Sequence, residues 1–144
     1  MGFAGDLVDR STKAWNTHDF GEWSATFTES AHLAGPGGLS GRGRDTQQLF
    51  HSIWTDGFPD NQVTNVRIVD DGDSAVLEAV FEGTHTGVLK APTGDIPATG
   101  KRVSIPFVVT YSCADGFLTG FRLYFDQMDL ITQLGLDAAD RESR

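Results

Sequence analysis

The stretch that decides the fold is RVSIPFVVTYSCADGFLTGFRLYFD, residues 102–126. Two runs of alternating character, 102–113 and 117–126, flank the pair Asp115-Gly116. An Asp-Gly pair between such runs is a strong signal for a β-hairpin with a two-residue turn. The stretch therefore predicts two long antiparallel strands.

A two-residue turn pairs Ala114 with Phe117 and fixes which side chains share a face. One face then carries Ile105, Phe107, Val109, Tyr111, Arg122, Tyr124 and Asp126, and the other carries Pro106, Val108, Thr110, Phe121, Leu123 and Phe125. The first face predicts a pocket, because three polar groups buried without partners in a solid core would cost ~1–3 kcal/mol each. The second is apolar on its last strand and predicts a subunit interface. A three-residue turn would reverse every assignment.

The segments before the hairpin extend the β-region toward the N-terminus. Strands are predicted over residues 63–69 and 74–86, and a long loop that can act as a lid over 87–100. Leu77, Ala79, Phe81, Gly83 and His85 share one face of the second strand, which places His85 near the rim of a pocket. After the hairpin, a helix over 128–134 should end at Gly135.

The first third of the chain is predicted to be helical. Apolar spacing indicates a helix over residues 3–17, a short one capped by Asp19, and a third over 45–55. The glycine-rich residues 35–43 fit no nucleotide-binding or nucleophile motif and are predicted to be a flexible connection. Helices followed by an antiparallel meander give an α+β fold, one domain over 1–144, whose curved sheet leaves a cone with an open end.

Composition excludes several classes of partner. The 144 residues carry a formal net charge of -9, which disfavours nucleic acid and anionic membranes. The single cysteine, Cys113, excludes an internal disulfide, and no apolar run reaches the ~18 residues of a membrane span. The first residues lack the features of a signal peptide, so a cytoplasmic location is expected.

Three residues of the first face and its surroundings are candidates for chemistry. Asp126 precedes a helix and can be its N-cap, a general acid/base, or both, because a carboxylate backed by Phe107 and Tyr124 would be desolvated. Arg122 can pair with Asp126 or bind an oxyanion. His85 can be structural or can shuttle a proton. These alternatives stay open from the sequence.

The remaining histidines are not expected to take part in the site, whereas the aromatic residues are expected to form its walls. No two His or Cys residues stand at ligand spacing, so no metal site is expected, and the isolated histidines are expected to be structural or exposed: His18, His32 and His51. Trp23 is expected in the core. The walls that bind a small aromatic substrate are predicted to consist of Trp15, Phe50, Trp54, Phe81, Phe107, Val109 and Tyr111.

Several short motifs, in order along the chain, resemble those of the SnoaL-like polyketide cyclases, which belong to the nuclear transport factor 2-like superfamily. The motifs are Trp15-Asn-Thr-His-Asp19, Phe58-Pro-Asp60, Phe81-Glu-Gly-Thr-His-Thr-Gly87, Ala98-Thr-Gly-Lys101, Tyr124-Phe-Asp-Gln127 and Gln133-Leu-Gly135. The resemblance implies a cone-shaped α+β barrel, a homodimer and a reaction without metal or organic cofactor.

The resemblance also implies a reaction and roles for residues. Such cyclases close a ring of an aromatic polyketide by intramolecular aldol condensation in antibiotic biosynthesis, with an aspartate at the position of Asp126 as general acid/base. His85, Tyr124 and Arg122 would then orient the substrate and stabilise an enolate oxygen. The cyclases place a histidine where this chain has Val109 or Tyr111, which favours the related cofactor-independent hydroxylases. A third alternative is a small-molecule-binding protein without turnover.

Overall fold

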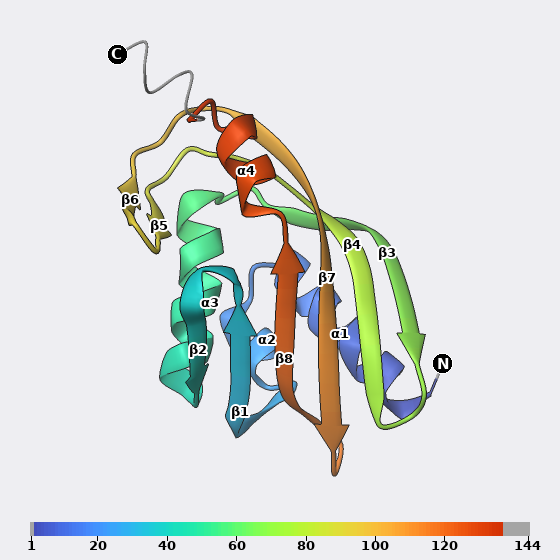
Figure 1. Cartoon of the computed structure of the whole chain (residues 1–144). Helices are drawn as coiled ribbons and strands as arrows, with labels where there is room; N and C mark the ends of the chain where they lie inside the picture. Colours follow the sequence, from blue (N-terminus) through green and yellow to red (C-terminus); the bar gives the residue numbers. More distant parts are fainter. Residues whose placement is uncertain (1, 137–144) are drawn as a thin grey trace.

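The computed structural model describes residues 2–136, and its centre is a six-stranded sheet in the order β2-β1-β8-β7-β4-β3 (Figure 1). Met1 and residues 137–144 of the expected domain lie outside the described residues. All neighbouring strands are antiparallel except β1 and β8. The predicted α+β class is confirmed. The strands are β1 (Phe27–Gly35), β2 (Leu39–Arg42), β3 (Gln62–Asp70), β4 (Ser74–Thr84), β7 (Arg102–Ala114) and β8 (Phe117–Phe125).

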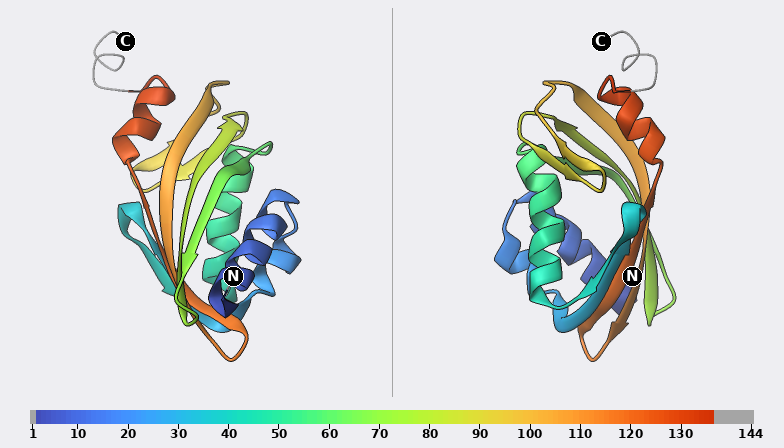
Figure 2. Two further views of the ribbon diagram at one scale, coloured as in Figure 1. Left: turned by 90° about the vertical axis from the view of Figure 1, so that its right-hand side faces the viewer. Right: turned by 60° about the vertical axis from the view of Figure 1, so that its left-hand side comes forward.

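Three helices cover one side of the curved sheet (Figure 2). They are α1 (Phe3–Asn16), α2 (Phe20–Ser24) and α3 (Arg44–Gly57). As its apolar spacing predicts, α1 buries Leu7, Val8 and Trp15. The expected cap of α2 is also present, since Asp19 Oδ1 accepts a hydrogen bond of 3.0 Å from the Glu22 N–H. The fold thus places the apolar helix faces against the concave side of the sheet.

The end of the cone is covered by a small hairpin and a last helix. Residues 87–100, predicted to be a loop, contain strands β5 (Leu89–Ala91) and β6 (Gly94–Ile96). Leu89 packs in one buried cluster with Phe58 and with Leu130 of α4 (Gln127–Gln133). None of the helices within residues 2–136 is both long and apolar enough to cross a membrane.

Strands β1 and β2 were not predicted from the sequence. Residues 35–43, expected to be flexible, contain the last residue of β1, the turn η1 (Pro36–Gly38) and all of β2. Gly37 and Gly38 both have positive φ, 81° and 83°, a conformation that glycine adopts at little cost. Strand β1 carries exposed polar residues such as Glu29 and Ser30, which break the alternation that marks a strand.

The hairpin of β7 and β8 begins as predicted and then changes register. Asp115 and Gly116 have positive φ, 54° and 85°, as a type I′ turn requires, and Ala114 pairs with Phe117. Cys113 then pairs with Leu118 but Ser112 with Gly120, so Thr119 is an extra residue in β8. Such a bulge moves every later side chain to the other face.

The bulge overturns the predicted faces of β8. Phe121, Leu123 and Phe125 pair with Tyr111, Val109 and Phe107 on the concave side. Arg122 and Tyr124 point to the outer face, where both are exposed. The predicted subunit interface through the three apolar residues is therefore wrong, because they line the interior.

Candidate active site

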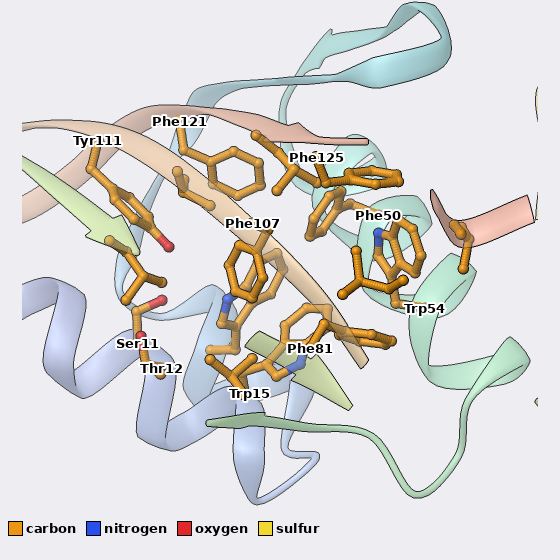
Figure 3. A pocket seen from close by; sticks show the side chains of 17 residues that line it. Ser11, Thr12, Trp15, Phe50, Trp54, Phe81, Phe107, Tyr111, Phe121 and Phe125 are labelled. Carbon is orange, nitrogen blue, oxygen red and sulfur yellow. The ribbon is translucent and has the colours of Figure 1, made fainter. Parts of the chain in front are cut away.

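The concave side of the sheet and helices α1–α3 surround a cavity with about 690 Å³ of space free of protein atoms, a volume that includes the solvent at its mouth (Figure 3). The seven predicted wall residues all line it: Trp15, Phe50, Trp54, Phe81, Phe107, Val109 and Tyr111. Their contact with a substrate stays a prediction. Other lining residues are Ser11, Thr12, Trp23, Val63, Leu77, Ile105, Phe121, Leu123, Phe125 and Leu130.

Aromatic rings form most of the wall and hold one another in place. Trp23 stacks on Phe50 with ring centroids 6.0 Å apart. Trp54 meets Phe81 and Phe125 edge-on, with centroids 5.4 and 5.5 Å apart. Such contacts stabilise fixed ring orientations in addition to the burial of apolar area. The wall is therefore suited to a flat, largely apolar molecule.

Among residues 2–136, the lining has few polar atoms and no Asp, Glu, His, Lys or Arg side chain. Trp15 Nε1 donates a 2.8 Å hydrogen bond to Asn61 Oδ1, and Thr12 Oγ1 donates one of 2.8 Å to the Val8 carbonyl. Tyr111 is the only titratable group, and burial raises its pKa above its usual range. Its hydroxyl therefore stays protonated and can donate a hydrogen bond to a ligand.

Asp126 is the N-cap of α4. Its Oδ1 accepts hydrogen bonds from the N–H groups of Met128, 2.9 Å, and Asp129, 3.2 Å, and the side chain is exposed. The expectation that Phe107 and Tyr124 desolvate it is wrong. Asp126 follows Phe125, which lines the cavity, but is not itself among the lining residues. The structural role is present, and the catalytic role stays a prediction.

Arg122 and Tyr124 lie on the outer face and do not reach the cavity. Arg122 borders a shallow polar groove there with His32 and Arg42. Within residues 2–136 no ion pair joins Arg122 to Asp126. Tyr124 is 52% exposed. The bulge in β8 explains both placements, so the two residues cannot orient a substrate inside this cone.

His85 directly follows β4. It is covered by residues 99–101, which precede β7, and it does not line the cavity. It is fully buried against Phe58, and its Nδ1 accepts a 3.2 Å hydrogen bond from the Thr99 N–H. Its backbone N–H also donates to the Lys101 carbonyl, 2.8 Å. Burial lowers the pKa of His85. These contacts make it a neutral side chain that fixes this segment, away from the cavity lining.

The other histidines have different surroundings. His51 is buried among Trp15 and Trp23, and burial, assisted by nearby His18, lowers its pKa. Its Nε2 has no hydrogen-bond partner among the described residues. His32 is bonded to the Ser40 hydroxyl at 2.9 Å. In the part of the chain that the structure describes, no three His, Cys, Asp or Glu residues gather as metal ligands would.

Comparison of the sequence with models of protein families identifies one match, SnoaL-like polyketide cyclase, over residues 5–134. The chain belongs to this family. No curated protein matches the sequence. Membership in the SnoaL-like polyketide cyclase family agrees with the resemblance found in the short motifs, and the matched residues cover all of the described helices and strands except the first two residues of α1.

Solved structures share the fold of this SnoaL-like chain. A provisionally named SnoaL-like polyketide cyclase from Jannaschia sp. CCS1 is 21% identical, with a TM-score of 0.82 over 94% of this chain and 93% of that one. A provisionally named polyketide cyclase from Xanthomonas campestris is 21% identical, with a TM-score of 0.81 over 92% of this chain and 96% of that one. AclR from Streptomyces galilaeus, provisionally named a hydroxylase, is 20% identical, with a TM-score of 0.76 over 90% of this chain and 93% of that one. At these identities the likeness concerns the fold alone.

Ser11 and Phe121 are cavity residues of this SnoaL-like chain that the sequence analysis did not predict. Ser11 shares the buried face of α1 with Leu7 and Trp15, and a polar residue on that face was a usable signal. Phe121, whose placement depends on the bulge, had no such signal.

Proposed function

We propose that this chain binds a flat, largely apolar ring compound inside its cone, of the class that includes aromatic polyketides, and acts on it without a cofactor. The observation that carries the proposal is the cavity wall, which is mostly aromatic and has no charged side chain. Ligand sites of this kind obtain affinity from burial and specificity from a few polar groups. A charged ligand would lose its hydration here without gaining a counter-charge.

Binding is tested by filling the cavity from one residue. Val109 on β7 is 5% exposed and lines the cavity, whereas its neighbour Val108 points to the outer face. With naphthalene as probe in equilibrium dialysis, Val109→Phe should abolish the saturable binding that the natural chain shows, and Val108→Phe should preserve it. The proposal fails if the natural chain does not bind naphthalene, or if both variants bind it equally.

The proposed reaction is the ring closure named by the family, in which a base removes a proton from a carbon next to a carbonyl. Since no carboxylate or imidazole lines the cavity, we propose Asp126 as the base. Its neighbour Phe125 and, one helical turn later, Leu130 both line the cavity. This role requires that the first turn of α4 release the two capping hydrogen bonds, so that the carboxylate is free to meet a ligand.

Deuterium exchange separates this reaction from its alternatives. 6-Hydroxy-2-tetralone carries a phenolic oxygen at the end opposite its carbonyl. With this compound in D₂O as probe, a base in the cone exchanges the protons next to the carbonyl, and Asp126→Asn should lower that rate by ~10²-fold or more. Exchange that is unchanged in Asp126→Asn contradicts the role of Asp126. A hydroxylase would in addition consume molecular oxygen with its own substrate, and a binding protein would bind 6-hydroxy-2-tetralone without accelerating exchange.

A further inference from the structure

One end of the cavity holds two hydroxyl groups that, among the residues the structure describes, lack a hydrogen-bond partner. Ser11 on α1 and Tyr111 on β7 are 1% and 8% exposed. Figure 3 shows both side chains at the same end of the cavity. Among the described residues neither hydroxyl has a hydrogen-bond partner, and neither oxygen is sealed off from the cavity space, whereas the adjacent Thr12 hydroxyl already donates to the Val8 carbonyl.

Two unpartnered hydroxyls in an apolar cavity need a partner. A buried polar group without a hydrogen bond is costly, and it is usually satisfied by water or by a ligand. Burial keeps Tyr111 protonated, so its hydroxyl donates, while a serine hydroxyl can donate or accept. Both groups can therefore form hydrogen bonds with an oxygen-bearing group of a ligand at this end of the cavity.

We propose that Ser11 and Tyr111 are the specificity-determining pair of the cavity and that they recognise a neutral carbonyl or phenolic oxygen on the ligand. This inference rests on the proposed function, in which the cone binds a flat ring compound. A carboxylate does not fit, because no Lys, Arg or His side chain lines the cavity to balance its charge.

The pair also sets the direction in which the ligand lies. Tyr111 is near the end of β7 that joins the hairpin, whereas α4 contacts the beginning of β7, where the Ser104 N–H donates 2.7 Å to Gln133 Oε1. The oxygen-bearing ring therefore lies farthest from α4. The rest of the ligand extends past Phe107 toward Phe125 and the rim that carries Asp126.

The test measures how well the protein distinguishes 1-naphthol from naphthalene in equilibrium dialysis. The quantity compared is the ratio of the two dissociation constants, which cancels general effects on the cavity. Because a single hydrogen bond changes affinity by about tenfold or less, Tyr111→Phe should reduce this preference for 1-naphthol by about five- to tenfold. Ser11→Ala should reduce it by a smaller factor.

Thr12→Val is the matched control, because its hydroxyl lines the same cavity but is already bonded. It should leave the ratio unchanged, and 1-naphthoate should bind more weakly than 1-naphthol. The inference is overturned if naphthalene binds but the ratio is the same in Tyr111→Phe, Ser11→Ala and the natural chain, or if 1-naphthoate binds best. If naphthalene does not bind the natural chain, the proposed function itself fails.

Discussion

The bulge in β8 decides which residues form the cavity, and two phenylalanines on that strand test it. Phe117 and Phe121 are four positions apart, so regular alternation would place them on the same face. The bulge at Thr119 places them on opposite faces. Phe117 is 45% exposed, whereas Phe121 is 7% exposed.

The structure gives the expected size of the effect. The Phe121 ring contacts those of Phe27, Phe50 and Tyr111, with centroids 5.8, 5.0 and 5.8 Å apart. Phe→Ala in a packed core costs about 3–5 kcal/mol, and we expect about 3 here because part of the ring faces the cavity. For a chain of this size, that lowers the melting temperature by roughly 6–12 °C. Phe117→Ala should cost less than about 1 kcal/mol.

Urea unfolding followed by tryptophan fluorescence measures both variants. Each midpoint, with its slope, gives the free energy of unfolding. An equal, small loss in Phe121→Ala and Phe117→Ala would refute the bulge and restore the regular register. In that case Arg122 and Tyr124 would face the cavity, and the site would have to be rebuilt around them.

Three further predictions concern other parts of the chain. His51 and His85 are buried with lowered pKa values, so below pH ~6.5 the unfolded chain binds protons that the folded chain does not. The free energy of unfolding should therefore be highest above that pH and fall below it by up to ~1.4 kcal/mol per pH unit for each histidine. In acid unfolding experiments, His51→Phe should reduce this slope. Asp126→Ala should lower the free energy of unfolding by about 1 kcal/mol through loss of the α4 cap, while Asp126→Asn keeps the cap and should melt almost normally in calorimetry. We still expect a homodimer, now through the outer sheet face with exposed Val76 and Tyr124; Tyr124→Glu should then sediment as a monomer, and a natural chain that is monomeric at micromolar concentration would contradict the interface.

Much of the fold could be predicted because its signals are local. The Asp115-Gly116 turn, the Asp19 cap and the spacing of Leu7, Val8 and Trp15 each depend on neighbouring residues, and the structure confirms them. The aromatic walls followed from the same patterns on β7 and on the helices. These features need no knowledge of distant contacts.

The features that could not be predicted depend on contacts between distant segments. The bulge at Thr119 lies where β8 begins to pair with β1, and Gly120 packs against the backbone of His32 so closely that a Cβ would lie 2.7 Å from its carbonyl oxygen. Neither Thr119 nor Gly120 is a recognisable signal of a bulge in the sequence. The resulting change of face moved Arg122 and Tyr124 out of the site and Phe121 into it.

The most direct test is a crystal structure of the natural chain with 1-naphthol. We predict the naphthalene rings between the aromatic walls, in contact with Phe107, and the ligand oxygen within hydrogen-bond distance of the Tyr111 and Ser11 hydroxyls. A ligand found in the cone with its oxygen at the rim beside Asp126, or found only in the groove next to Arg122, would contradict the proposed recognition.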